Sequence, residues 1–249
     1  MKISIYIVGT NNYFPLALRF IKKFHKFYKG AYEIEYLLFA DQYAPAFLPP
    51  DIKVKLINVE HSNWVQGTNS KFKNIIDNIH NIDSNFIFYF DADTNIIKNF
   101  NEQWFIGSLV GGQHYNHVGD KFPPFERRKE SKAYIPLDTD RPQIYHYGAF
   151  FGGLKNKVLK MCEELYALQQ EDSKIGLEPI WNDESYLNHF FHYNDHKIVP
   201  SHEFQFMISD KGGLETRDTK IERKTLDMLK IYKNEDWEIA NGKVLCLTR

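Results

Sequence analysis

Short apolar runs alternate with longer stretches of helical spacing along the first ninety residues of the chain. Short runs bounded by polar turns are typical of strands, and they cover residues 2–8, 33–39, 54–59 and 86–90. Apolar residues three and four positions apart predict two helices, one over about 15–28 and one from Asn69 or Ser70 to about Ile82. Strands and helices in this alternation indicate βαβ units and a parallel sheet.

The strand expected over residues 86–90 stops abruptly at two carboxylates, Asp91 and Asp93, with one small residue between them. Ligands of an open α/β sheet bind beyond the carboxyl ends of its strands, where these side chains would emerge. Carboxylate oxygens on a rigid strand end suit Mg²⁺ or Mn²⁺, which keep coordination positions open for substrate phosphates. The alternative is an ordinary turn, because Asp is also common in turns. The apolar run ahead of the pair favours the metal site.

The second half of the chain is less regular. Its apolar runs predict strands over residues 108–114 and 147–153, with a long polar loop over 116–142 between them. Two helices are expected, one over about 155–170 and one that Asn182 or Asp183 would cap. Glu184 falls in the first turn of the latter, where the helix dipole favours an ionised carboxylate. The tail from residue 218 is charged and weakly periodic, and only a helix near 225–231 is expected there.

Composition limits the functional classes. The 249 residues fit one large domain or two small ones, and 43% of them are hydrophobic. A net charge of −1 gives no general attraction to nucleic acid. The spacing of the two cysteines, Cys162 and Cys246, fits neither a metal-ligand pattern nor a disulfide framework. The default expectation is therefore two reduced thiols in a cytoplasmic protein. No apolar stretch reaches the roughly 20 residues of a transmembrane helix, and the first strand is too short for a signal peptide.

Several short motifs resemble those of one known family. They are Arg127-Arg128, Ala133-Tyr134-Ile135-Pro136, Tyr147-Gly148-Ala149-Phe150-Phe151-Gly152-Gly153 and Trp181-Asn182-Asp183-Glu184-Ser185. In this order and spacing they resemble glycosyltransferase family 6, which includes the histo-blood-group A and B transferases, the α-1,3-galactosyltransferase and the Forssman synthase. The resemblance covers roughly residues 3–205. It implies an α/β protein of the GT-A fold, with a Rossmann-like mixed sheet flanked by helices and an Asp-x-Asp metal motif at a strand end.

The resemblance implies a UDP-sugar-dependent hexosyltransferase that moves galactose or N-acetylgalactosamine to the 3-hydroxyl of a galactoside, with retention and an α-1,3 linkage. Its partners would be a UDP-sugar donor and a glycan acceptor, and its cofactor Mn²⁺ or Mg²⁺. Asp91 and Asp93 match the residues that hold the metal, and Glu184 matches the proposed catalytic carboxylate. Besides Asp91, the positions that match donor or nucleotide contacts are Val8, Thr10, Tyr13, Lys71, Tyr147, Gly148, Ala149 and Asp183. The positions that match acceptor contacts are His114 and Trp181.

General chemistry agrees with these roles. A metal ion bound to the diphosphate neutralises the charge that develops on the departing UDP. A carboxylate on the opposite face can attack or stabilise the oxocarbenium-like sugar that departure leaves. Many bacterial relatives that look metal-independent carry asparagine in place of the two aspartates, so Asp91 and Asp93 favour metal dependence here.

Some positions depart from the mammalian pattern, and they lie on or near the acceptor side. Pro124 replaces a hydroxyl residue, Asn182 a histidine, and Met207 a carboxylate that binds the acceptor. The bulk of Tyr147 together with Ala149 favours galactose slightly over N-acetylgalactosamine as the donor sugar. The residues before the first strand offer no Golgi anchor or stem, so a soluble microbial or viral member is expected, in the cytoplasm of the microbe or of the host.

The glycosyltransferase domain is expected over residues 1–217, and a tail over 218–249 whose Lys243 and Arg249 could close over the donor site. Two other classes remain open. A sugar nucleotidyltransferase would also use carboxylates and a metal, but Gly9-Thr10-Asn11-Asn12 is a poor match to its glycine-rich loop. The nucleotide-binding patterns Gly-x-Gly-x-x-Gly and the P-loop do not occur. A non-catalytic carbohydrate-binding relative would have lost the acids that this chain keeps.

Overall fold

The computed structural model describes residues 1–41, 48–60, 64–96, 99–201, 207–209, 237–240 and 243–246. The chain forms two compact units. The first comprises Met1–His61, Tyr89–Trp104 and Glu203–Arg249, and the second comprises Ser62–Phe88 and Phe105–His202. Strand β4 (Phe86–Phe90) starts in the second unit and ends in the first. The predicted boundary at residue 218 lies outside the described residues.

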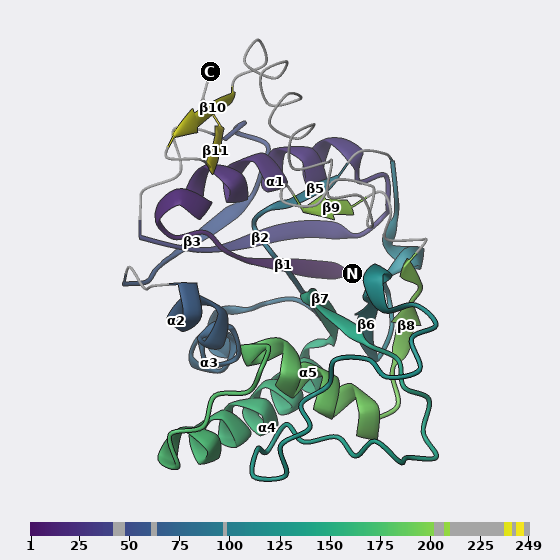
Figure 1. Ribbon diagram of the computed structural model, residues 1–249. Helices are drawn as coiled ribbons and strands as arrows, with labels where there is room; N and C mark the ends of the chain where they lie inside the picture. The colour runs from purple at the N-terminus through teal and green to yellow at the C-terminus, as the bar shows by residue number, and fades with distance from the viewer. Residues whose placement is uncertain are drawn as a thin grey trace. The chain divides into compact units, whose positions relative to one another are not determined.

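The first unit begins with the predicted βαβ arrangement (Figure 1). Strands β1 (Lys2–Val8), β2 (Glu33–Ala40) and β3 (Val54–Asn58) pair in parallel, in the order β3-β2-β1, with β4 beside β1. Helix α1 (Phe14–Phe27) connects the first two strands and carries Pro15 in its first turn, as expected. Its Phe20 and Phe24 are buried and contact Phe90, with ring centroids 5.3 and 5.7 Å away. The apolar stripe of the helix thus forms the core with the sheet.

The remaining strands of the first unit were not predicted. Strand β5 (Thr94–Ile96) pairs antiparallel with β9 (Met207–Ser209), and β10 (Trp237–Ala240) pairs antiparallel with β11 (Lys243–Cys246). Runs of three or four residues contain too few positions for an alternating pattern to stand out. Two short 3₁₀ helices, Asn11–Tyr13 and Glu102–Trp104, complete the unit. The helix expected near 225–231, like Arg249, lies outside the described residues.

The second unit makes the sheet mixed, as the resemblance implied. Its strand order is β4-β7-β6-β8, in which β6 (Leu109–Gln113) runs antiparallel to β7 (His146–Leu154) and parallel to β8 (Lys197–Val199). Strand β8 was not predicted, again because it has only three residues. Helix α4 (Lys155–Lys174) contacts α3 (Lys71–Asn78), α5 (Asn182–Tyr193) and β7. The α/β class with a helix-flanked mixed sheet is therefore confirmed.

Two helices of the second unit differ from the prediction. The helix expected from residue 69 or 70 to 82 starts where it was expected but is shorter, and another helix that was not predicted precedes it. Helix α2 (Trp64–Asn69) comes first, α3 ends at Asn78, and a 3₁₀ turn follows over Ile79–Asn81. Ser70 is the residue before α3, but its hydroxyl donates to the carbonyl of Gly67 instead of capping the helix. Helix α4 runs four residues beyond the expected end at 170, because the buried Asp172 in its last turn is held by hydrogen bonds.

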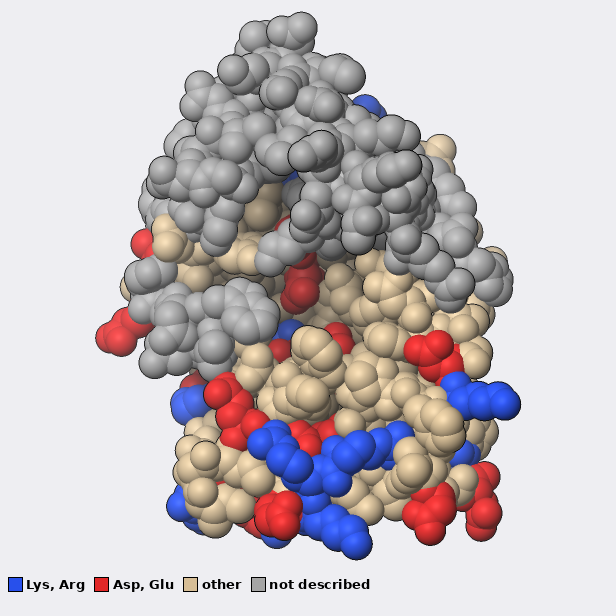
Figure 2. Space-filling view, in the orientation of Figure 1, with Lys and Arg blue, Asp and Glu red and all other residues tan. Residues whose placement is uncertain are grey.

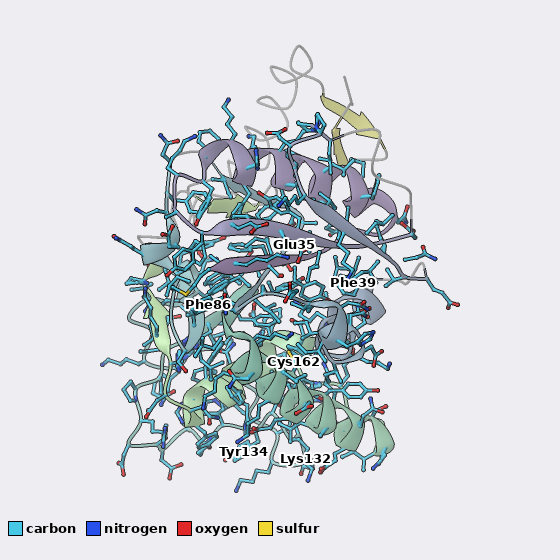
Figure 3. The ribbon with its side chains drawn as sticks, turned by 180° about the vertical axis from the view of Figure 1, so that it is seen from behind. Glu35, Phe39, Phe86, Lys132, Tyr134 and Cys162 are labelled. Atoms are coloured by element: carbon cyan, nitrogen blue, oxygen red, sulfur yellow. The ribbon has the colours of Figure 1, made fainter. Side chains whose placement is uncertain are left out.

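The core of the second unit is aromatic. The ring of Phe88 contacts those of Phe105 and Phe150 at 4.8 and 6.0 Å. Cys162 on α4 lies in this core (Figure 3), and burial raises the pKa of its thiol. It packs as a small hydrophobic residue, as expected. Basic and acidic side chains are mixed over the part of the surface formed by α4 and α5 (Figure 2), in keeping with a net charge near zero. None of the described helices has the length and apolar character needed to cross a bilayer.

Candidate active site

Helix α5 begins with the segment that carries the predicted carboxylates. Trp181, rather than Asn182 or Asp183, is its N-cap residue, and the Trp181 N–H donates to the hydroxyl of Ser185 at 3.0 Å. The expected capping role of Asn182 and Asp183 is therefore wrong. Asn182 has a φ of 47°, a left-handed conformation that asparagine tolerates better than most residues. This bend brings Asp183 and Glu184 into the first turn of the helix.

The carboxylate of Glu184 accepts one hydrogen bond on each oxygen. The hydroxyl of Tyr145 donates to Oε1 at 2.8 Å, and the backbone N–H of Gly148 donates to Oε2 at 2.6 Å. A side chain at position 148 would push Glu184 away, because a Cβ atom there would lie 3.0 Å from Oε2 of Glu184 and 3.1 Å from its Cβ. Gly148 therefore permits the close approach of strand β7 and helix α5 that orients the carboxylate.

Asp183 forms a buried ion pair next to Glu184. Its Oδ2 lies 2.6 Å from Nζ of Lys71, whose side chain is 2% exposed. The same ammonium group donates to the carbonyl of Gly148 at 3.2 Å. Lys71 is the first residue of α3, so this pair joins α3, β7 and α5. A buried pair of this kind is costly to break, because removing one partner leaves the other charge unpaired.

Asn188 holds helix α5 against strand β7. Its amide group accepts from the His146 N–H at 2.7 Å and donates to the His146 carbonyl at 3.0 Å, in the manner of a neighbouring strand. The same amide donates to the carbonyl of Glu184 at 2.9 Å. The position of Glu184 relative to β7 is therefore fixed through its backbone as well as its side chain.

The environment of Glu184 shifts the pKa of its carboxyl group to about 7. Burial is the largest cause and raises the pKa, and the neighbouring charge of Asp183 raises it further. The hydrogen bonds from Gly148 and Tyr145 and the charge of Lys71 act in the opposite direction. A buried carboxylate whose pKa lies near neutrality beside an ion pair is a frequent mark of a functional group.

The predicted acceptor residue His114 lies beside Tyr147, with ring centroids 4.8 Å apart and the rings nearly perpendicular. Burial, together with the nearby His117, lowers the pKa of His114 to about 4, so its ring is neutral at physiological pH. Ala149 is buried in β7. The other predicted acceptor residue, Trp181, is 49% exposed.

Five predicted residues belong to the first unit: Val8, Thr10, Tyr13, Asp91 and Asp93. Val8 ends β1, and the Thr10 carbonyl accepts from the Tyr13 N–H at 3.0 Å in the turn that leads to α1. Asp91 opens a second turn, in which its carbonyl accepts from the Thr94 N–H at 3.0 Å. The two aspartates thus follow β4 directly, at a strand end, in a turn.

The donor set at this strand end suits a hard divalent cation. Oδ1 of Asp91 accepts a hydrogen bond of 2.5 Å from the hydroxyl of Tyr89, which orients the carboxylate. Among the described residues no three His, Cys, Asp or Glu side chains gather at one point. Two carboxylates at a strand end are the hard oxygen ligands that Mg²⁺ and Mn²⁺ accept at nucleotide sites, alongside water and substrate phosphates.

The second unit brings together residues that are far apart in the sequence: Lys71, Gly148, Asp183 and Glu184. Two contributors were missed. Tyr145 lies two residues before Tyr147, so the alternation of a strand would have placed it on the same face. Asn188 lies four residues after Glu184, which places both on one face of a helix.

Comparisons with known proteins all give glycosyltransferases. A protein-family model described as Glycosyltransferase family 6 matches residues 1–230. The chain is 29% identical to the O-antigen biosynthesis glycosyltransferase WbnI of Escherichia coli, over 89% of this chain and 93% of that protein. It is 26% identical to globoside alpha-1,3-N-acetylgalactosaminyltransferase 1 of Gallus gallus, over 80% of this chain but only 60% of that protein. A shorter stretch, 41% of this chain and 30% of the relative, is 35% identical to histo-blood group ABO system transferase 2 of Rattus norvegicus.

Proposed function

The chain belongs to glycosyltransferase family 6 and is a hexosyltransferase, and from this premise we propose the reaction that it catalyses. The donor is UDP-galactose or UDP-N-acetylgalactosamine, the acceptor is a galactoside, and the product is an α-1,3 linkage with retained configuration. One relative is named as an alpha-1,3-N-acetylgalactosaminyltransferase, and this supports the linkage and one of the two donors.

The arrangement of Glu184 carries this proposal. A carboxylate held on both oxygens, by Tyr145 and by Gly148, is kept in one orientation by these hydrogen bonds. Its charged neighbour Asp183 is neutralised by Lys71, so the site is not a simple acidic cluster. This is the preorganised negative charge that an oxocarbenium-like transition state requires.

In the proposed reaction the bond between C1 of the sugar and the diphosphate oxygen breaks, and its electron pair leaves with UDP. A bond forms between C1 and O3 of the acceptor, whose hydroxyl proton passes to the departing diphosphate. Glu184 stabilises the positive charge that develops at C1, and Asp183 and Lys71 orient the donor sugar. Tyr147, Gly148 and Ala149 border the sugar and contribute to donor choice. His114 and Trp181 contact the acceptor, while Val8, Thr10 and Tyr13 hold the uridine.

Asp91 and Asp93 would hold Mn²⁺ or Mg²⁺ in this proposal. When bound, the ion neutralises the charge that builds up on the diphosphate leaving group. The contribution of the chain itself is to keep the two carboxylates in place, through the turn closed by Thr94 and the hydrogen bond from Tyr89.

The proposal is tested by measuring UDP release from each donor with a panel of galactosides, and by determining the linkage of any product by NMR. Glu184→Gln keeps the size of the side chain and removes its charge, so kcat should fall by at least about 100-fold. Glu164→Gln, an exposed change on α4, is the matched control and should have no effect. A wild-type protein that turns over neither donor with any galactoside would disprove the proposed reaction, as would a fully active Glu184→Gln.

The metal is tested separately. UDP release should vanish in EDTA, return with Mn²⁺, and be lost in Asp93→Asn even when Mn²⁺ is present. Turnover that EDTA leaves unchanged would show that Asp91 and Asp93 have a structural role only, and it would leave the transfer reaction itself standing.

A further inference from the structure

The Arg127-Arg128 motif has no part in the chemistry proposed above, and the two side chains form hydrogen bonds of different reach. Arg127 donates from Nη1 to the carbonyls of Ile135 and Pro136, at 2.7 Å each, and so folds its own loop. Arg128 instead bonds to a segment outside the loop between β6 and β7, donating from Nη2 to the carbonyl of Glu178 at 2.6 Å. The second arginine therefore connects the loop to the segment that leads into α5.

Glu126 completes this connection. Its side chain is buried, and Oε1 accepts from the backbone N–H and from Nε of Arg128, both at 2.9 Å. Oε2 accepts from Nη2 of Arg128 at 2.7 Å and from the backbone N–H of Ile180 at 2.9 Å. Burial raises the pKa of Glu126, but these hydrogen bonds, with those from Arg128 first, lower it to about 2. The carboxylate is thus ionised and fully engaged at any working pH.

Glu126 and Arg128 therefore form hydrogen bonds to two backbone groups of the segment before α5. Arg128 donates to the carbonyl of Glu178, and Glu126 accepts from the N–H of Ile180. Trp181 follows immediately. Half of its surface is exposed, so packing alone does not fix its position. The backbone N–H of Glu184 donates to the Trp181 carbonyl at 3.0 Å, but the carboxylate of Glu184 is held by a different set of bonds, from Tyr145 and Gly148.

We propose that Glu126 and Arg128 are positioning residues that hold Trp181 in place for the acceptor sugar and so set the affinity for the acceptor. The inference rests on the proposed function for the part played by Trp181. The pair does not touch the donor-side group of Lys71, Asp183 and Glu184. Loosening it consequently weakens acceptor binding and leaves donor cleavage intact.

The test uses the full-length protein and separates the two substrates. Arg128→Ala should raise the KM for the acceptor by about tenfold or more, the effect of losing charged hydrogen bonds. The KM for the UDP-sugar and the slow hydrolysis of the donor without acceptor should stay within about twofold. The acceptor KM of Arg128→Lys should lie between those of the wild type and Arg128→Ala, because an ammonium group cannot form the two parallel hydrogen bonds of the planar guanidinium. Lys132 lies in the same loop as Arg128. Lys132→Ala breaks its exposed ion pair with Glu171 of α4, and this variant should behave as wild type.

A second readout needs no activity. The protein has four tryptophans, so ¹⁹F NMR of protein labelled with 5-fluorotryptophan gives four resonances, and Trp181→Phe identifies that of Trp181. Arg128→Ala and Arg128→Lys should shift or broaden this line, whereas Lys132→Ala should not. Acceptor and donor kinetics that fall together in a folded Arg128→Lys, or a Trp181 line that does not respond, would overturn the inference. If the wild type has no transferase activity, the proposed reaction fails, and the ¹⁹F spectra still decide whether the pair positions Trp181.

Discussion

The hydroxyl of Tyr145 donates a hydrogen bond of 2.8 Å to Oε1 of Glu184, and so connects the start of strand β7 to the first turn of helix α5. The Tyr145 ring is itself packed between His117 and Phe125, with centroids 4.8 and 5.4 Å away. Its hydroxyl therefore has little freedom to leave the carboxylate. This contact should control the charge of Glu184 as well as its orientation.

Tyr145→Phe should move the acid limb of the kcat/KM profile to higher pH. Burial raises the pKa of Glu184 to about 7, and the hydrogen bond from Tyr145 lowers it by stabilising the ionised form. Without that bond the pKa rises, by about one unit for a typical hydrogen bond, and a larger fraction of Glu184 is protonated at neutral pH. Because kcat/KM reports the free enzyme, its pH dependence is the measurement.

Tyr193→Phe is the control for this shift, since Tyr193 lies on the same helix and is exposed. Its profile should match that of the wild type. An acid limb that stays in place in Tyr145→Phe, even with reduced activity, would mean that Tyr145 orients the carboxylate without affecting its pKa.

Gly148→Ala should lower kcat by roughly 10- to 100-fold, the usual penalty for moving a reacting group by a fraction of an ångström to an ångström. The new methyl group would lie 3.0 Å from Oε2 and 3.1 Å from Cβ of Glu184, so the side chain has to move. Rates at saturating donor and acceptor are the measurement, with circular dichroism to verify folding. A folded variant with wild-type kcat would show that the position of Glu184 is not critical.

Most of the strands that the sequence predicts are buried along most of their length, and the edge strand β3, whose residues are half-buried or exposed, is the exception. Strands β1, β2 and β4 read as apolar runs because their central residues face the core on both sides of the sheet. Strands β8 and β9 have three residues each, and their pairing depends on partners far along the chain, Leu109–Gln113 and Thr94–Ile96. No local pattern contains that information.

In the candidate site, too, contacts between residues far apart in the sequence could not be predicted from local patterns. Asp91 and Asp93 stand out because they interrupt an apolar run, whereas the pairing of Lys71 with Asp183 joins positions 112 residues apart and has no local signal. Only the resemblance to a family placed Lys71 near the donor. Asn188 was missed because an asparagine within a helix looks like a surface residue until its bonds to the β7 backbone are seen.

Tyr89→Phe should weaken metal binding by about tenfold, a typical effect of losing a group that orients a ligand. The hydroxyl of Tyr89 lies 2.5 Å from Oδ1 of Asp91 and fixes the rotation of that carboxylate. The Kd for Mn²⁺, measured in the presence of UDP by the paramagnetic resonance of the free ion, tests this without any turnover. An unchanged Kd would assign Tyr89 to packing alone.

Tyr36→Phe should leave the protein as stable as the wild type or up to about 1 kcal/mol more stable. The hydroxyl of Tyr36 is buried and has no hydrogen-bond partner among the described residues, so its desolvation is uncompensated. Tyr28→Phe is the matched contrast. It removes a hydroxyl that donates to Glu102 at 2.9 Å, and should cost about 1 kcal/mol. Urea unfolding followed by circular dichroism compares the two, and equal losses would contradict this account.

Asp172→Asn should destabilise the fold by about 2–3 kcal/mol. Asp172 is fully buried, and its carboxylate accepts hydrogen bonds from the hydroxyls of Ser131 and Tyr186, both at 2.9 Å, and from the Lys132 N–H at 2.8 Å. An asparagine replaces one of the two acceptor oxygens by an amide donor, so either the Lys132 N–H would face another donor or the two hydroxyls would have to turn from donating to accepting.

The neighbouring change Glu171→Gln breaks only an exposed ion pair with Lys132 and should cost less than about 0.5 kcal/mol. Unfolding in urea measures both. Tyr186 lies two residues after Glu184 on α5. Because Tyr186 donates to Asp172, Asp172→Asn should also reduce kcat, by shifting α5 and with it Glu184, although Asp172 does not contact the substrates in this proposal. An Asp172→Asn protein that loses no more stability than Glu171→Gln would show that the three hydrogen bonds contribute little, and that α5 does not depend on the bond between Tyr186 and Asp172.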